Sequence, residues 1–281
     1  MILLDYNAIA IGNVAVQRLA ADEGLIRHMI LNSIRMYRQK FHKEYGEMVI
    51  VADGMNNWRK DAFPQYKAAR RKKRDESSID WQEVFRIINM VREEIQENFP
   101  YKVMHEDGCE ADDVIAQLAI ETQEFGKHEP VMIVSADGDF KQLQVYKNIK
   151  QFSPMTKKLV VENNPRTYLA EHILKGDAGD GVPNVLSDDN VFVDGRRQGI
   201  LSAKKKAALL DDPRALGDEI YRNYQRNQQL IDLKNCPQSV KESIINNFEQ
   251  QDPWGNRPKV FPYLVQKRCK LLIECVGEFI S

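Results

Sequence analysis

VMIVSADGDFKQLQ, from Val131 to Gln144, is the stretch around which the chain is organised. Its apolar start has the form of a strand buried on both faces, which is typical of the parallel sheets of α/β proteins. The run leads directly into Asp137 and Asp139. Two other apolar runs, MILLD and MVIVAD, end at Asp5 and Asp53. Because ligands gather at the carboxyl ends of parallel strands, these endings predict carboxylates that converge at one edge of a sheet.

A fourth acidic group, Glu110-Ala-Asp112-Asp113, follows the short apolar run YKVMHE and opens a predicted helix. The helix dipole favours acids in the first turn, but three acids in four positions are more than a helix start needs. A single aspartate at a strand end is also common as an N-cap or turn residue. The metal-binding hypothesis therefore depends on the whole set of acids.

Carboxylates in such a cluster need a counter-charge. Two of them about 5 Å apart repel each other by about 3 kcal/mol at an effective dielectric constant near 20. Oxygen ligands without a nearby His or Cys favour Mg²⁺ or Mn²⁺ over Zn²⁺. The number of acids favours two ions, which together stabilise the attacking and leaving oxygens of a phosphoryl transfer. No histidine is expected at this site or as a general base, because the histidines share no motif: His28, His42, His105, His128 and His172.

The composition excludes several classes of protein. The chain has 281 residues and a net charge of -1. This near-zero net charge is a poor guide to partners, because acidic residues are concentrated at the strand ends and basic residues lie elsewhere. No apolar run is long enough to cross a membrane, and Met1 leads directly into a strand with no signal peptide before it. The cysteines form no C-x-x-C pair, which predicts reduced thiols and a cytoplasmic location: Cys109, Cys236, Cys269 and Cys275.

The order of the predicted elements indicates an α/β fold. We expect a central, mainly parallel sheet with helices on both faces, a hairpin over 150–161, and a smaller C-terminal helical domain. The predicted helices span 22–41, 81–99, 165–175, 202–210, 213–229, 237–250 and 260–280. The predicted division is an α/β domain over 1–180 and a smaller helical domain over 181–281.

A basic tract from Arg59 to Arg74 holds eight Lys or Arg and one Asp, with Trp58, Phe63 and Tyr66 among them. This combination suits a segment that follows a phosphate backbone and stacks on bases. The alternative is a solvated charged loop. Because the tract has little apolar periodicity, we expect a mobile flap over the metals.

Two further motifs follow. Gly176-Asp-Ala-Gly-Asp-Gly-Val-Pro183 carries Asp177 and Asp180, which either reach a metal or form a turn. The helix after Ser202 begins with lysines that can hold a phosphate together with the helix N-terminus: Lys204, Lys205 and Lys206. Three other acids are expected in a surface loop, away from any metal: Asp188, Asp189 and Asp194.

These motifs resemble those of the flap endonuclease family of structure-specific 5′ nucleases. They occur in the family's order, as the two strand-end aspartates, Glu-Ala-Asp-Asp at 110–113, Ser-Ala-Asp-Gly-Asp-Phe at 135–140 and Gly-Asp-x-x-Asp-Gly-Val-Pro at 176–183. The resemblance covers most of residues 1–210. The run Trp58-Arg59-Lys60-Asp61 is similar to that of the bacteriophage ribonucleases H in this family. Each motif alone is weak, but the combination is specific.

The resemblance implies a 5′ to 3′ exonuclease that removes RNA primers and adjacent DNA from the lagging strand. It also implies flap cleavage, two Mg²⁺ ions for which Mn²⁺ substitutes, and 5′-phosphate products. One metal site is implied at Asp5, Asp53, Asp112, Asp137 and Asp139, with Glu110 and Asp113 close by. The second is implied at Asp177 and Asp180.

The resemblance also implies how the nucleic acid is held. A bridge over residues 56–80 would place Lys67 and Arg70 at the scissile phosphate, so that the implied catalytic set is Asp112, Asp137, Asp139, Lys67 and Arg70. The implied contacts to nucleic acid are Arg59, Lys60, Lys67, Arg70, Arg71, Lys72, Lys73, Lys204, Lys205 and Lys206. A helix-hairpin-helix element would follow residue 180, but the insertion of residues 188–197 disfavours the K⁺ ion that some members bind there.

The implied partners are forked, flapped or nicked duplex DNA and RNA–DNA hybrid. A single-stranded-DNA-binding protein and a sliding clamp are further candidates, although no clamp-binding tail follows Phe279. The protein is expected to be a monomer. Two other functions were weighed. An aspartyl-phosphate phosphatase needs a second Asp where this chain has Asn7, and a non-catalytic DNA-structure-binding module would have lost carboxylates that are all present.

Overall fold

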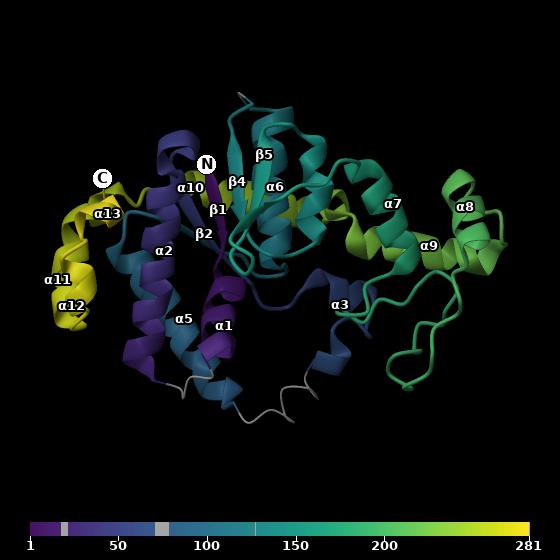
Figure 1. Ribbon diagram of the computed structural model, residues 1–281, viewed down its shortest axis with the longest axis horizontal. Helices are drawn as coiled ribbons and strands as arrows, with labels where there is room; N and C mark the ends of the chain where they lie inside the picture. The colour runs from purple at the N-terminus through teal and green to yellow at the C-terminus, as the bar shows by residue number, and fades with distance from the viewer. Residues whose placement is uncertain (18–21, 71–78, 127, 281) are drawn as a thin grey trace.

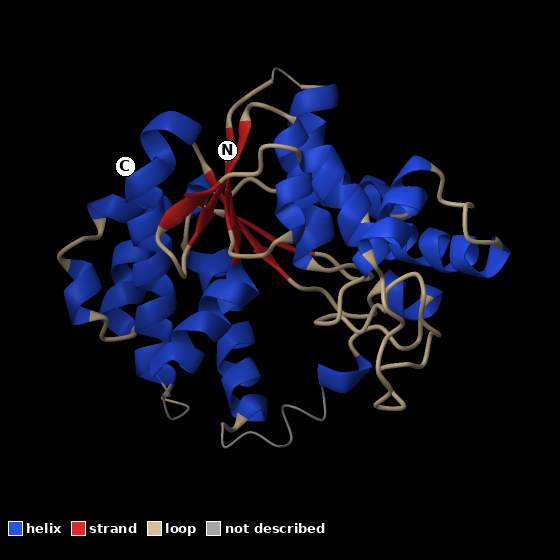
Figure 2. Ribbon diagram, turned by 45° about the vertical axis from the view of Figure 1, so that its right-hand side comes forward, coloured by secondary structure: helices blue, strands red, loops and turns tan. Residues whose placement is uncertain are grey.

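A six-stranded sheet lies at the centre of the protein (Figures 1 and 2). The computed structural model describes residues 1–17, 22–70, 79–126 and 128–280. The strands lie in the order β3-β2-β1-β4-β5-β6. Their bounds are β1 Ile2–Asp5, β2 Met48–Ala52, β3 Lys102–His105, β4 Val131–Val134, β5 Ile149–Ser153 and β6 Lys158–Val160. All neighbouring strands are parallel except β5 and β6, which form the predicted hairpin. The prediction of a mainly parallel sheet is confirmed.

The three acid-bearing strands are adjacent because of this order. β1 lies between β2 and β4, and every residue of these three strands is buried. This burial explains their continuous apolar runs, since a strand covered on both faces has no polar side. The carboxyl ends of β1, β2 and β4 therefore meet at one edge.

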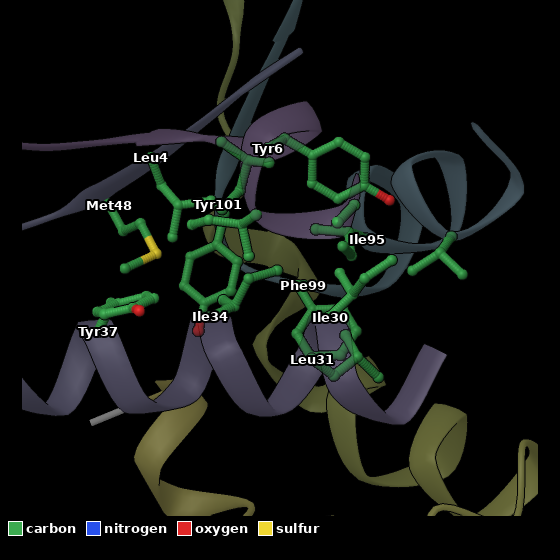
Figure 3. Close-up of a cluster of buried hydrophobic side chains, with 14 of the residues drawn as sticks. Leu4, Tyr6, Ile30, Leu31, Ile34, Tyr37, Met48, Ile95, Phe99 and Tyr101 are labelled. Atoms are coloured by element: carbon green, nitrogen blue, oxygen red, sulfur yellow. The ribbon is translucent and has the colours of Figure 1, made fainter. Parts of the chain in front are cut away.

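One face of the sheet is covered by α1 Tyr6–Gln17, α2 Glu23–Tyr45 and α5 Trp81–Asn98. Figure 3 shows Ile34 and Tyr37 of α2 on the side of Leu4 and Met48 of the sheet, and Ile30 beside Phe99. The helix at 22–41 was predicted, and Asp22 caps it by accepting from Leu25 N at 2.7 Å. α1 was not predicted from the sequence.

The other face is covered by α6 Ala111–Glu124, η1 Asp139–Val145 and α10 Gln238–Gln250. The apolar side chains of α6 and η1 pack on the alternate residues of β1, β2 and β4. The result is a three-layer arrangement with helices on both faces, as predicted.

A helical C-terminal region lies beside the sheet and then returns to it (Figure 1). α7 Pro165–Lys175, α8 Ala203–Asp211 and α9 Asp218–Ile231 hold two smaller apolar clusters of their own. After η2 Leu233–Asn235 and α10, η3 Trp254–Lys259 leads to helices that pack on the same core as α2 and α5: α11 Val260–Gln266, α12 Lys270–Ile273 and α13 Gly277–Ile280.

Two predicted helices differ from the observed ones. The single helix expected over 260–280 is wrong, because Arg268 has a positive φ of 55° that ends the first of the three short helices. The helix expected over 213–229 begins only at Asp218, after Gly217 with φ 101°. The boundary between domains at residue 180 stays a prediction. No helix among the described residues is long and apolar enough to cross a membrane.

Candidate active site

Three strand ends bring the first group of acids together. Asp5 ends β1, and its carboxylate accepts hydrogen bonds from Ala8 N at 3.1 Å and Ser135 Oγ at 2.8 Å. Asp53 follows β2 and accepts from Ala111 N at 3.0 Å, which ties β2 to the start of α6. The tight turn after β4 is held by Asp137, whose Oδ1 accepts from Asp139 N at 2.8 Å. The predicted convergence of carboxylates is therefore present in the structure.

The pKa values show how closely these acids interact. Burial raises the pKa of Asp5 to about 7, and the charges of Asp53 and Asp137 add to the effect. Burial and then the charge of Asp137 raise the pKa of Asp112 well above its usual range. Burial, followed by the charge of Asp139, raises the pKa of Asp137 to about 6. Raised pKa values in several neighbouring carboxyls are the expected sign of a cluster that lacks counter-charge.

The loop after α7 supplies a second group of acids. Asp177 Oδ1 accepts from Gly179 N at 2.7 Å and from Asp180 N at 3.1 Å, so this aspartate also forms its own turn. Burial raises the pKa of Asp177, and the charges of Asp180 and Asp139 raise it further. The structure shows the turn, and metal binding by Asp177 stays a prediction.

Basic residues of the bridge, as far as residue 70, supply positive charge to these acids. Lys67 Nζ pairs with Glu110 and lies 3.4 Å from Asp180 Oδ2, and Arg70 pairs with Asp180. The hydroxyl of Tyr66 donates toward Glu110 and Asp180, each at 2.7 Å. Burial alone would raise the pKa of Asp180, but Lys67 and Arg70 outweigh it and hold that pKa below its usual range.

The premise of the mobile flap, that the tract buries no apolar face of its own, is wrong for residues 59–70. Phe63 and Tyr66 are 3% and 4% exposed and pack against Ile173, Val182 and Leu230. The backbone is also held, since Lys67 N donates to Asp180 O at 2.7 Å. The aromatic residues among the charges therefore form a small core. The remaining predicted contacts, Arg71, Lys72 and Lys73, lie outside the described residues.

Arg59 and Asp113 differ from their predicted roles. Arg59 is 2% exposed and forms two hydrogen bonds to the Asp113 carboxylate, at 2.7 and 2.8 Å. Asp113 is fully buried and accepts in addition from Trp58 Nε1 and from Glu110 N. Since Arg59 has no exposed guanidinium and the Asp113 oxygens are taken, the pair holds the bridge to α6. Arg59 also lies 3.8 Å from Glu110 Oε2 and lines a small pocket with Asp112 and Asp139, so the pair borders the carboxylate cluster.

His172 is a site residue that the sequence analysis missed. It lies in the last turn of α7, with Nε2 at 3.1 Å from Asp139 Oδ1 and 3.8 Å from Asp177 Oδ2. The prediction that no histidine lies at the site is wrong. Burial alone would lower the pKa of His172, but the contacts with Asp139 and Asp177 outweigh burial and raise that pKa. No local motif reveals this contact, because it depends on the packing of α7 against η1.

An open groove of about 760 Å³ leads to the acids. Asp53 and Glu110 line it, together with Arg92 of α5 and with Lys60, Lys67 and Arg70 of the bridge. Figure 1 shows α5 and α3 Trp58–Ala62 on opposite sides of this region. The groove is thus lined by both basic and acidic side chains. This combination suits a phosphate backbone that approaches cations bound by the acids.

The remaining predicted residues lie apart from the site. Lys204 and Lys205 are exposed at the start of α8, and Lys206 pairs with Glu171 at 2.9 Å. The three acids expected in a surface loop form ion pairs with Arg196, Arg222 or Arg226: Asp188, Asp189 and Asp194.

The donor set fits divalent cations. Asp139, His172 and Asp177 each offer one ligand atom, and these atoms lie within 4.8 Å of one another. The strand-end carboxylates add hard oxygen ligands beside them.

Comparisons with known proteins agree with this arrangement. A family model for the 5′-3′ exonuclease N-terminal resolvase-like domain matches residues 1–172. A model for the C-terminal domain of T4 RNase H matches residues 165–279. The ribonuclease H of Enterobacteria phage T4 is 32% identical, over 99% of this chain and 95% of that protein. A 5′-3′ exonuclease of Buchnera aphidicola is 28% identical, over 56% of this chain and 53% of that protein.

Solved structures of a bacteriophage T5 flap endonuclease share the fold. One, crystallised with metal ions, has a TM-score of 0.61 and 16% identity, and the match covers 88% of this chain and 98% of that one. Another, a complex with DNA and metal ions, has a TM-score of 0.61 and 17% identity, over 89% and 99% of the two chains. At these identities the similarity concerns the fold.

Proposed function

Because the chain belongs to the 5′-3′ exonuclease and flap endonuclease family, we propose that it is a divalent-metal-dependent 5′ nuclease that removes RNA primers and adjacent DNA and cuts flaps. The observation that supports this proposal is the convergence of strand-end carboxylates beneath two basic residues of the bridge. Asp5 and Asp137 have raised pKa values in this cluster, and Lys67 and Arg70 lie at its opposite side.

We propose that the acids hold two Mg²⁺ ions, for which Mn²⁺ substitutes. The ligands of the first ion would be Asp5, Asp53, Asp112, Asp137 and Asp139, with Glu110 nearby. Asp177 and Asp180 would complete the second. When bound, such ions supply a nucleophilic water and stabilise the charge of the phosphoryl transition state.

The chain's own residues orient the phosphodiester in this proposal. Lys67 is 15% exposed and lies between Glu110 and Asp180, so its ammonium can exchange a carboxylate for a phosphate oxygen without leaving the site. Arg70, which is 45% exposed, is better placed to meet the incoming strand. Both charges would stabilise the negative charge that develops on the phosphate. The product would carry a 5′ phosphate.

The proposed substrates are forked, flapped or nicked duplex DNA and RNA–DNA hybrid. The groove beside the bridge would hold the strand that is cut, and Lys204 and Lys205 would contact the duplex backbone. In this division, residues 1–180 carry the nuclease chemistry and 181–281 the duplex contacts. A single-stranded-DNA-binding protein and a sliding clamp are proposed as partners, and no K⁺ site is proposed.

The test is cleavage of a 5′-labelled, RNA-primed duplex in Mg²⁺. Asp139→Asn should abolish cleavage and leave duplex binding within a few fold, because it removes a ligand and no phosphate contact. Asp194→Asn is the control, since this carboxylate pairs with Arg196 in a surface loop and should cleave like the wild type. Asp177→Asn should be impaired less than Asp139→Asn, with partial rescue as the Mg²⁺ concentration rises.

Wild-type turnover by Asp139→Asn would contradict the proposed site. Duplex binding by the wild type without cleavage in Mg²⁺ or Mn²⁺ would instead favour a non-catalytic module of the same fold.

A further inference from the structure

Three side chains from different elements meet at one point of the site. His172 comes from α7, Asp139 is the first residue of η1, and Asp177 lies in the loop after α7. In an octahedral site with bonds of about 2.1 Å, neighbouring ligand atoms lie about 3 Å apart. The separations of 3.1 and 3.8 Å from His172 Nε2 to the two carboxylates are close to this spacing. Small side-chain movements would therefore place all three on one ion.

His172 Nε2 also lacks a hydrogen bond. This atom is buried and has no hydrogen-bond partner among the described residues. Asp139 Oδ1 lies 3.1 Å away as an ion-pair partner, but the pair does not have hydrogen-bond geometry. A buried polar atom without a hydrogen bond costs free energy. A cation between the two carboxylates would satisfy it.

The neighbouring residues hold these ligands in place. The Tyr168 ring stacks on the His172 ring with centroids 5.7 Å apart and an interplanar angle of 9°. Asp177 Oδ1 is taken by the backbone N–H groups of Gly179 and Asp180, which leaves Oδ2 toward His172. The imidazole and the carboxylate are therefore oriented before any ion binds.

We propose that His172 is a nitrogen ligand of the second of these divalent ions, which Asp139 would share with the first and Asp177 would bind, and that this second site binds Mn²⁺ or a later first-row metal more tightly than Mg²⁺. The inference rests on the proposed function, which needs cations among these acids. Imidazole suits transition metals, whereas Mg²⁺ takes oxygen ligands and loses its waters reluctantly. One nitrogen donor thus distinguishes this ion from the one held by the strand-end carboxylates alone.

The experiment is pulsed electron paramagnetic resonance of Mn²⁺ bound to the full chain, combined with Mn²⁺ and Mg²⁺ titrations. The wild type should show the ¹⁴N coupling of a coordinated imidazole. His172→Phe keeps a ring for Tyr168 to stack on but has no donor, so it should lose the ¹⁴N coupling and bind Mn²⁺ at least about tenfold more weakly. His172→Gln replaces nitrogen with a carboxamide oxygen, and should lose the coupling and the preference for Mn²⁺ over Mg²⁺. His28→Gln on α2 is the matched control and should behave as the wild type.

Absence of ¹⁴N coupling in the wild type, or wild-type Mn²⁺ affinity in His172→Phe, overturns the assignment of His172 as a ligand. The second result would show that the ring acts only through packing. A wild type that shows the coupling but cleaves no nucleic acid with either metal supports the ligand and overturns the nuclease proposal. The two failures are therefore distinguishable.

Discussion

Arg59 shows how burial changes the role of a charged residue. Its guanidinium and the Asp113 carboxylate are almost completely removed from water, with side-chain exposures of 3% and 0%. Such a pair adds little net stability over an apolar pair of the same shape, but removing one partner leaves an uncompensated buried charge. A structural role for Arg59 therefore predicts a large effect on folding.

We expect Arg59→Met to lower the free energy of unfolding by about 3–5 kcal/mol, because Asp113 is left unpaired. The measurement is urea unfolding with the chelated, metal-free protein. The control is the double variant Arg59→Met with Asp113→Asn, which removes the stranded charge and should recover much of the loss. If Arg59→Met instead lowered the free energy of unfolding by less than about 1 kcal/mol and made DNA binding less dependent on salt, Arg59 would be a nucleic-acid contact and not a structural residue.

Asp5 provides a pH-dependent prediction for the metal-free protein. Its pKa of about 7 in the folded state compares with about 3.9 for an unfolded chain. The folded state therefore binds more protons between these values, and the stability contributed by protonated Asp5 is lost as pH rises through them. A shift of about 3 units corresponds to about 4 kcal/mol as an upper limit.

Asp5→Asn, which cannot ionise, should thus become more stable relative to the wild type as the pH rises from about 4 to about 8. Urea unfolding in chelator at both pH values measures the change, and Asp194→Asn serves as a control whose difference from the wild type should vary little with pH. A difference for Asp5→Asn that is the same at both pH values would mean that the buried charge is already compensated in the folded protein.

The candidate site was predictable where its residues follow local patterns. Asp5, Asp53 and Asp137 were found because each directly follows an apolar run, and parallel strands carry such residues to one edge. The contact between His172 and Asp139 has no local signal, because it joins two elements that only tertiary packing brings together.

At the scale of elements, the bridge is a docked segment as far as residue 70. The sequence suggested mobility because charges outnumber apolar residues between 59 and 74. Phe63 and Tyr66 attach the bridge to the rest of the protein, because they pack in a small apolar cluster with residues of α7 and α9. A few buried aromatic contacts can therefore outweigh a high local density of charge.

We expect trypsin to cut slowly after Lys67 in the wild type, because the backbone on both sides of that bond is hydrogen-bonded, Lys67 N to Asp180 O and Ala68 N to Gln65 O. Phe63→Ala should lower the cost of local opening by about 3 kcal/mol or more and raise cleavage after Lys67 at least about tenfold. Mass spectrometry of the earliest fragments is the measurement. Phe125→Ala, at a side chain that is 76% exposed, is the matched control. A wild type whose first cut falls after Lys67 would support the mobile flap instead.

The elements differed in how well the sequence predicted them. Buried strands and helices with an N-cap residue were predicted from local sequence, for example β4 and α2 with its N-cap Asp22. α1 escaped prediction because its sequence, YNAIAIGNVAVQ, has no acid in the first turn, no base in the last and a glycine in the middle. The break at Arg268 was hidden because apolar residues continue on both sides of it.

At the scale of the whole molecule, the last helices pack on the same apolar core as the first strand. Phe279 of α13 is fully buried, packs against Phe99 with ring centroids 5.4 Å apart, and accepts a hydrogen bond from the Tyr101 hydroxyl through its backbone carbonyl at 2.9 Å. The cluster that contains Phe279 also contains Ile2 and Leu4 of β1. The last helices therefore stabilise the sheet whose edge carries the acids.

Phe279→Ala should lower the free energy of unfolding of the whole protein by about 3–5 kcal/mol, because it opens a cavity beneath the sheet. Phe261→Ala is the matched control, since that side chain is 52% exposed on α11 and its loss should cost about 0.5 kcal/mol or less. Urea unfolding followed by both far-ultraviolet circular dichroism and tryptophan fluorescence is the measurement, and the two signals should shift together for Phe279→Ala. A different result would be that Phe279→Ala lowers the urea midpoint of a minor early transition and leaves the midpoint of the main transition unchanged. The C-terminal helices would then be an independently folding unit that contributes little to the stability of the sheet.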